Sequence, residues 1–309
     1  MFAPSQGPPS SQQRGVRQRF IAGALARMDE RPAGKAHKPA SISVSDLAEM
    51  KRAGRKITVL TAYQTEDALL VDRAGVDVIL VGDSGGMALL GYADTTHVTL
   101  DDMLWMTRSV ANANTRALVV GDMPIHSYDT PDTAVENARK FIKAGADVVK
   151  LEGGVEKKDI VKAIVSAGIP VMGHIAHTPQ TDRRHVIEGK TLAEEGKLLA
   201  DAKALEEAGV FAIVIELADA AVSKKITESV RIPTIGIGAG PHTDGQVLVL
   251  DDLLGLTDPA KFPSGRLPKF VGEWPKDPAS AVKQYIEKVR SGAFPGPSES
   301  YSVLAPVTK

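Results

Sequence analysis

The stretch Ala146-Asp-Val-Val-Lys-Leu-Glu-Gly-Gly154 decides how the rest of this chain is interpreted. Its apolar start is typical of a buried strand, yet it ends in a lysine, a carboxylate and two glycines. Because side chains alternate along a strand, Lys150 and Glu152 are expected to point to the same side. Two charges on one face of a core strand are costly unless they have partners or a function. Several other predicted strands end in the same way.

Around that stretch, short apolar strands alternate regularly with helical patterns. The predicted strands are 57–62, 76–81, 117–121, 146–151, 170–174, 210–216, 233–237 and 246–250. The predicted helices between them are 66–74, 100–112, 131–144, 158–167, 192–208 and 220–229, and several close on an Ala-Gly pair, a usual left-handed stop. This alternation predicts a parallel (β/α)8 TIM barrel. An open doubly wound sheet is the alternative, but no Gly-x-Gly-x-x-Gly follows the first strand.

Composition excludes several classes of protein. The 309-residue chain carries 37 basic and 38 acidic residues, so it offers no broad charge to nucleic acid or to an anionic membrane. It contains no cysteine, which excludes disulfides, thiolate metal sites and cysteine nucleophiles. No apolar run approaches the roughly 20 residues that span a bilayer. We expect a cytoplasmic protein that acts on small molecules.

The two ends of the chain differ from its centre. Residues 1–42 are rich in Pro, Gly, Ser and Gln and carry no acid before Asp29, which predicts a disordered extension, with a transit peptide as the alternative. Residues 43–295 are expected to form one catalytic barrel domain that begins with a short helix capped by Ser43 or Ser45. A last helix, 280–291, would cap the barrel or reach a neighbouring subunit. Residues 296–309 are expected to form an irregular tail.

Charged and polar residues stand at the ends of five predicted strands. They are Asp83, Asp122, Lys150, Glu152, His174 and Glu216. Because the active site of such a barrel lies at the carboxyl ends of its strands, these side chains are expected to converge on one rim. The sequence therefore predicts a polar site that is competent to bind a metal ion.

Three of these carboxylates, Asp83, Asp122 and Glu152, lie on adjacent strands. An all-oxygen set of this kind favours Mg²⁺ or a similar divalent ion. Such an ion would hold an α-keto acid, polarise its carbonyl and stabilise an enolate. Lys150 would neutralise the substrate carboxylate. A Schiff base at Lys150 is the weaker option, because a lysine close to carboxylates should stay protonated.

Glu216 is the candidate general base, and burial is expected to raise its pKa towards the working range. Its alternative role is a fourth metal ligand or a group that supports the ligands. His174 is expected to hydrogen-bond the substrate or a carboxylate. The other histidines, which are His97, His126, His177, His185 and His242, are expected on the surface or in loops.

The chain also resembles the ketopantoate hydroxymethyltransferase family. The resemblance rests on Val81-Gly-Asp-Ser-Gly-Gly-Met87, the stretch 146–154, Pro170-Val-Met-Gly-His174, Thr178-Pro-Gln180, 232–241 and 244–250, in collinear order from about Ser45 to Pro295. It implies a barrel of the phosphoenolpyruvate mutase and isocitrate lyase type and a homo-oligomer, in this family typically a decamer. It also implies Mg²⁺ on Asp83, Asp122 and Glu152. Ser84, Asp122 and Lys150 would contact the keto acid, with Asp83 and His174 beside them. Glu216 would remove the C3 proton, and the enolate would attack the one-carbon unit of 5,10-methylenetetrahydrofolate.

Some positions depart from the family pattern. They are Gln64, Gly85, His97 and Leu217-Ala-Asp219, together with the segment 181–189, which is a few residues shorter than in the family. Because that segment borders the substrate in a barrel, an enzyme acting on another α-keto acid, by a lyase or aldol-type reaction, is an alternative. A non-catalytic barrel that serves assembly is a third hypothesis. The joint presence of Asp83, Asp122, Lys150, Glu152 and Glu216 argues against the third.

Overall fold

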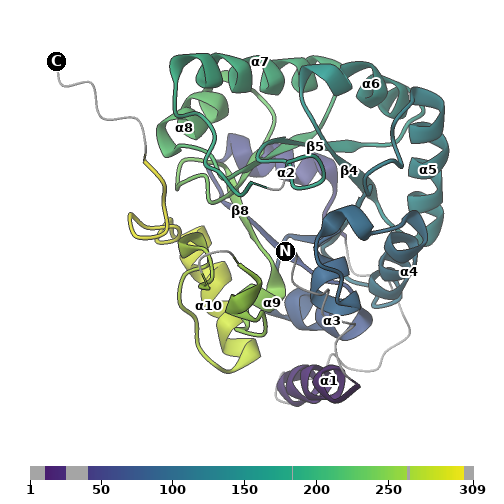
Figure 1. The fold of residues 1–309 in the computed structure, drawn as a ribbon, viewed down its shortest axis with the longest axis vertical. Helices are drawn as coiled ribbons and strands as arrows, with labels where there is room; N and C mark the ends of the chain where they lie inside the picture. Colours follow the sequence, from purple (N-terminus) through teal and green to yellow (C-terminus); the bar gives the residue numbers. More distant parts are fainter. Residues whose placement is uncertain (1–10, 26–40, 183, 263–264, 303–309) are drawn as a thin grey trace, which may run out of the picture.

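The computed structural model describes residues 11–25, 41–182, 184–262 and 265–302. Eight parallel strands close into a barrel in the order β1 to β8, and helices surround it (Figure 1). The strands are β1 (Ile57–Thr61), β2 (Val78–Val81), β3 (Leu118–Asp122), β4 (Val148–Glu152), β5 (Val171–Ala176), β6 (Ala212–Glu216), β7 (Thr234–Ile237) and β8 (Gly245–Leu248). The predicted barrel and its eight strands are confirmed, with ends that differ by a residue or two.

The helices around the barrel match the predicted pattern closely, except that a short helix after β8 was not predicted. They are α2 (Val44–Arg52), α3 (Thr65–Ala74), α4 (Leu100–Ala111), α5 (Pro131–Ala144), α6 (Lys158–Ser166), α7 (Leu192–Ala208), α8 (Ala220–Ser229), α9 (Leu250–Leu253) and α10 (Pro278–Arg290). Short turns of helix lie at Gly86–Leu90, Thr95–His97, Val155–Lys157, Pro259–Lys261 and Lys269–Val271. Ser43 caps α2 and forms a capping box with Asp46. Gly145 ends α5 in the left-handed conformation at φ 106°, as predicted for the Ala-Gly pairs.

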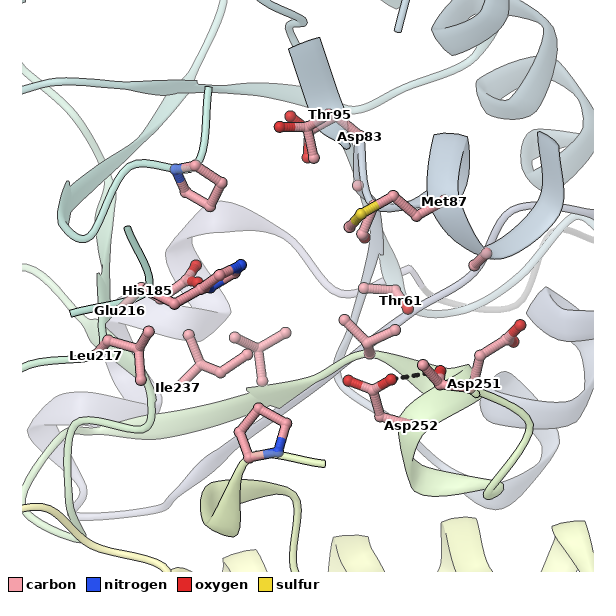
Figure 2. Close-up of a pocket in the computed structure, with 18 of the residues that line it drawn as sticks. Thr61, Asp83, Met87, Thr95, His185, Glu216, Leu217, Ile237, Asp251 and Asp252 are labelled. Atoms are coloured by element: carbon pink, nitrogen blue, oxygen red, sulfur yellow. Dashed lines mark hydrogen bonds between the residues drawn. The ribbon is translucent and has the colours of Figure 1, made fainter. Parts of the chain in front are cut away.

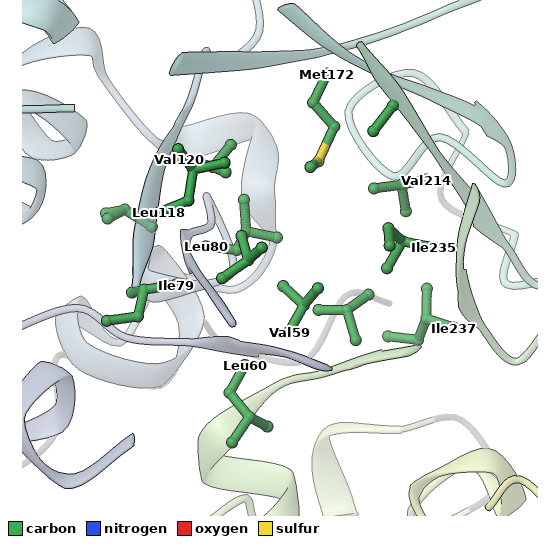
Figure 3. Packing of buried hydrophobic residues seen from close by; sticks show 14 of the residues in the cluster. Val59, Leu60, Ile79, Leu80, Leu118, Val120, Met172, Val214, Ile235 and Ile237 are labelled. Atoms are coloured by element: carbon green, nitrogen blue, oxygen red, sulfur yellow. The ribbon is translucent and has the colours of Figure 1, made fainter. Parts of the chain in front are cut away.

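The barrel interior is filled by the inward-facing side chains of the strands. Leu80, Val120, Met172 and Val214 point towards the centre of the barrel (Figure 3). Every second side chain of a strand points to the same side, so the residue two positions after each inward-pointing residue also points inward. Two positions after Val120, Met172 and Val214 stand the predicted site residues Asp122, His174 and Glu216. The charged groups therefore form the layer directly above an apolar core.

The last helix, α10, packs on its own barrel against α3 and β1. The hydroxyl of Tyr285 on α10 is fully buried and lies 3.0 Å from the carbonyl of Val59 and 2.7 Å from that of Gln246. These contacts tie α10 to β1 and β8. Helix α10 was predicted either to cap the barrel or to reach a neighbouring subunit. These contacts show that it covers the barrel.

The prediction of disorder for residues 1–42 is wrong for the segment Ser11–Leu25, which forms helix α1 (Figure 1). Helix α1 packs against α3 and α10, and its residues Ile21 and Ala24 are completely buried. The average composition of the extension hid this small apolar face. Residues 1–10, 26–40 and 303–309, to which parts of the extension and tail predictions refer, lie outside the described residues. Among the described residues we find no helix with the length and apolar character that a bilayer crossing demands.

Candidate active site

The predicted site residues do converge at the carboxyl ends of the strands. The strand register places Asp122 beside Lys150, and Glu152 beside His174. The side chains of these four residues are at most 4% exposed. They form the floor of a cavity of about 540 Å³, which Asp83, Ser84 and Glu216 also line. The cavity therefore unites every residue that was predicted for the metal, the keto acid and the base.

The cavity has walls of different chemistry (Figure 2). Asp83, Met87 and Thr61 lie on one side, and Glu216 with His185 and Leu217 lies on the other. Further from the strand ends the lining includes Asp251, Asp252, Leu256, Thr257, Phe262 and Phe270. The hydroxyl of Thr257 donates a 2.5 Å hydrogen bond to Asp252. The cavity thus continues well beyond the charged floor into a partly apolar chamber.

Lys150 and Asp122 form a buried ion pair on that floor. The ammonium Nζ lies 2.7 Å from each carboxylate oxygen of Asp122. Burial lowers the pKa of Lys150, but the carboxylates of Asp122, Glu152 and Asp83 outweigh burial, and the pKa lies above its ordinary value. Lys150 is therefore protonated, which suits a partner for a substrate carboxylate and disfavours Schiff-base chemistry.

The pKa of Asp83 reflects its burial close to other carboxylates. Burial raises its pKa to about 8, with a further contribution from the neighbouring carboxylate of Asp122. Burial also raises the pKa of Asp122, although Lys150 opposes it. With Asp83 and Glu216 the strand ends in the cavity hold four carboxylates against two cations, and a divalent ion would relieve this surplus of negative charge.

His174 lies between two carboxylates at ion-pair distance from each, although neither ring nitrogen has the geometry of the predicted hydrogen bond. Its Nδ1 is 3.4 Å from Glu152 Oε1, and its Nε2 is 3.2 Å from Glu216 Oε2. Burial lowers the pKa of His174, but these two carboxylates raise it to about 9. The ring therefore carries a proton and connects the metal-ligand candidate to the base candidate.

The expected direction of the Glu216 pKa is wrong. Burial does act to raise it, but the adjacent His174 ring lowers the pKa of Glu216 below its ordinary value. The side chain keeps 18% of its surface exposed to the cavity. Glu216 is thus an ionised carboxylate that faces the cavity, and ionisation is the state that a proton acceptor needs.

Two further predictions on single residues have different outcomes. The hydroxyl of Ser84 lies 2.9 Å from that of Tyr63 and lines the cavity, as expected for a substrate contact. His177, expected on the surface or in a loop, lies in the loop after β5 but is only 1% exposed, and its backbone N–H donates to the carbonyl of Glu216 at 3.0 Å. This loop begins after Ala176, where φ is 74°.

Gln180 is the site residue that strand-end reasoning missed. It lies in the segment after β5, is 2% exposed, and its Nε2 donates to Asp83 Oδ2 at 2.9 Å. Its backbone N–H donates to Glu152 Oε2 at 3.1 Å. The Thr178-Pro-Gln180 motif was the only sequence signal, because a loop residue has no periodicity that places it.

The donor set fits a hard divalent cation in chemistry and in charge, since it consists of three buried carboxylates with surplus negative charge. As the side chains lie, however, no three acidic or histidine groups of the described residues close around a single point. In this arrangement Lys150 occupies both oxygens of Asp122, and Gln180 donates to Asp83 and to Glu152. A cation that binds Asp122 would have to share it with Lys150 or displace the ammonium.

Solved structures with the same fold identify the class of the barrel. Phosphoenolpyruvate phosphomutase from Streptomyces platensis subsp. rosaceus is 17% identical with a TM-score of 0.52, covering 67% of this chain and 82% of its own. A 2,3-dimethylmalate lyase, a member of the phosphoenolpyruvate mutase/isocitrate lyase superfamily, is 14% identical with a TM-score of 0.51, covering 68% and 81%. At these identities the likeness concerns the fold. The protein is thus a (β/α)8 barrel that shares its fold with these structures.

Sequence comparison places the chain within this class. The sequence pattern of ketopantoate hydroxymethyltransferase matches residues 41–297. The 3-methyl-2-oxobutanoate hydroxymethyltransferase of Ignicoccus hospitalis is 52% identical over 261 residues, covering 82% of this chain and 97% of the relative. That of Moorella thermoacetica is 48% identical over 269 residues, covering 84% and 97%. The chain belongs to the ketopantoate hydroxymethyltransferase family.

Proposed function

We propose that this protein transfers a hydroxymethyl group from 5,10-methylenetetrahydrofolate to 3-methyl-2-oxobutanoate, giving 2-dehydropantoate, a step of pantothenate biosynthesis. The observation that carries the proposal is the convergence of Asp83, Asp122, Lys150, Glu152 and Glu216 on one cavity floor in a chain of this family. The reaction consumes one water, because the methylene carbon leaves the folate as a hydroxymethyl group. The remaining product is tetrahydrofolate.

Asp83, Asp122 and Glu152 would hold a Mg²⁺ ion. When bound, the ion would polarise the keto carbonyl and stabilise the charge of the enolate. Lys150 would turn from Asp122 towards the substrate and bind its carboxylate, since its ammonium is protonated and has three donors. The Ser84 hydroxyl, held by Tyr63, would orient the keto acid at the opposite edge.

Glu216 would take the proton from C3 of the keto acid. Its carboxylate faces the cavity, and His174 at 3.2 Å holds one of its oxygens in place. While Glu216 holds the proton, His174 would stabilise its other neighbour, the ionised carboxylate of Glu152. The nucleophilic carbon of the enolate would form the new bond to the one-carbon unit, and the outer chamber leaves room for the folate. The two bonds from that carbon to folate nitrogens would break, and its hydroxyl oxygen would come from the water that is consumed.

The direct test is product formation. Purified protein with 3-methyl-2-oxobutanoate, 5,10-methylenetetrahydrofolate and Mg²⁺ should form 2-dehydropantoate, and chelation of the metal should stop it. Absence of product under conditions in which a family member is active would refute the proposal. Hydrogen-deuterium exchange at C3, measured for a panel of keto acids, tests whether the enzyme acts on another substrate. Faster exchange of 3-methyl-2-oxobutanoate than of the other keto acids would contradict that alternative.

A homo-oligomer and a cytoplasmic location are part of the same proposal. Four large apolar side chains of the described residues are exposed, namely Trp105, Ile142, Val155 and Leu192, and Leu192 is 81% exposed. Such side chains are often covered in an assembly. Light scattering behind a sizing column should give a mass several times that of the 32.7 kDa chain.

A further inference from the structure

One residue, Gln180, contacts the ends of all three strands that carry a candidate metal ligand, through its side-chain amide and its backbone N–H. The Nε2 group of Gln180 donates to Asp83 Oδ2 at the end of β2, and also to the carbonyl of Met123, which follows β3, at 3.0 Å. The backbone N–H of Gln180 reaches Glu152 at the end of β4. The three contacts therefore connect the end of β2, the residue after β3 and the end of β4.

The orientation of this amide is fully determined by its partners. Both hydrogens of Nε2 are donated, and the oxygen Oε1 accepts a short hydrogen bond from the hydroxyl of Tyr128. Gln180 and Tyr128 are 2% and 4% exposed, so no water competes for these groups. Gln180 is absent from the cavity lining, whereas its neighbour Pro179 is part of it. The amide thus stands behind the carboxylates and out of reach of a substrate.

Gln180 also separates two parts of the segment after β5. The residues that follow it depart from the family pattern, and two of them, Arg184 and His185, are exposed and line the outer cavity. The side chain of Arg184 pairs with Asp182 within the same segment rather than with the strand ends. None of the described residues among 181–189 donates a hydrogen bond to Asp83, Asp122 or Glu152, whereas Gln180 donates to two of them.

We propose that Gln180 is a positioning residue that sets the separation of Asp83 and Glu152 for a divalent cation and insulates that site from changes in residues 181–189. The inference rests on the proposed function in one respect only, that the floor binds a divalent ion. Groups that hold metal ligands from behind typically change metal affinity or activity by about 10- to 100-fold when they are removed. Gln180→Met, which keeps the length of the side chain and removes both donors, should raise the Mg²⁺ dissociation constant by that factor.

The experiment is a calorimetric titration of the metal-free protein with MgCl₂ alone. The matched control is Gln246→Met, because Gln246 is another buried glutamine whose Nε2 donates twice, to Gly240 at 3.1 Å and to Thr243 at 2.8 Å, away from the cavity. This control should bind Mg²⁺ like the wild type even if it is less stable. Arg184→Ala should also leave Mg²⁺ affinity unchanged. In turnover assays, excess Mg²⁺ should restore most of the activity of Gln180→Met.

If Gln180→Met does not fold, Tyr128→Phe provides the same test, because it frees the amide and should weaken Mg²⁺ binding in the same direction by a smaller factor. Unchanged Mg²⁺ affinity in a folded Gln180 variant, equal weakening in Gln246→Met, or no Mg²⁺ binding by the wild type would overturn the inference. A different outcome would refute the proposed function alone. In that outcome the wild type binds Mg²⁺ more tightly than the Gln180 variant but forms no 2-dehydropantoate, and the role of Gln180 is unaffected.

Discussion

Removing the ammonium of Lys150 should destabilise the metal-free protein in a way that depends on pH. The pair with Asp122 is 2.7 Å long at both oxygens, and the two side chains are 4% and 2% exposed. Lys150→Met keeps most of the volume but leaves a buried carboxylate without its cation. Breaking a buried pair in this way costs about 3–5 kcal/mol. We expect this loss in the free energy of unfolding at pH 8.

The pH dependence follows from the pKa of Asp122, which burial already raises in the wild type. Without Lys150 the pKa should rise further, so the folded variant would hold a proton that the unfolded chain has lost. Stability then falls as pH increases between the unfolded and the folded pKa values. At pH 5, where Asp122 can be neutral, the difference between variant and wild type should shrink.

Urea unfolding at pH 5 and pH 8, followed by circular dichroism in the presence of a chelator, measures both effects. Lys140→Met is the control, because Lys140 pairs with Glu136 at 2.8 Å and both side chains are exposed, at 44% and 70%. An exposed pair of this kind contributes about 0.2–1 kcal/mol. A loss below about 1 kcal/mol for Lys150→Met at pH 8, or equal losses at the two pH values, would refute this reasoning. It would show that Lys150 does not stabilise the ionised carboxylate of Asp122 in the folded protein.

Three other changes test separate parts of the structure. Glu216→Gln should slow deuterium exchange at C3 of the keto acid by about 100-fold or more while Mg²⁺ affinity measured by calorimetry stays within a few-fold, and fast exchange would exclude Glu216 as the base. Gly85→Leu should cost about 1–3 kcal/mol in urea unfolding, because a Cβ there would lie 2.6 Å from the sulfur of Met106 and 2.7 Å from the ring of Tyr63. A neutral result would mean that this departure carries no packing constraint. Ile21→Ala should cost about 2–5 kcal/mol if helix α1 is part of the folded unit, and no change in the unfolding midpoint would separate α1 from it.

The residues on strands could be predicted from the sequence because alternation is a local rule. Once Lys150 and Glu152 were assigned to one face of a strand, their shared orientation followed, and the barrel fold supplied the rim on which Asp122, His174 and Glu216 meet them. The same rule accounts for the apolar layer below them. For this part of the site, local sequence and fold class were sufficient.

Positions set by the path of a loop or by a distance could not be predicted in this way. Gln180 and His177 are buried in the loop that follows Ala176, a residue with positive φ. No periodic pattern in the sequence predicts the path of that loop. The pKa of Glu216 depends on the 3.2 Å approach of His174, which opposes the effect of burial. Burial alone, the only quantity that a sequence suggests, gave the wrong direction.

The sharing of inward strand positions between core and site restricts which insertions and deletions this protein can tolerate. One residue inserted in β4 below Lys150 would turn Lys150 and Glu152 outwards, so the chain would lose core packing and chemistry in a single event. Two inserted residues would restore their facing but lift them by roughly 6.6 Å relative to Asp122 and His174. Length changes should therefore be confined to the connecting segments, while the strands that carry the charged layer keep a fixed length.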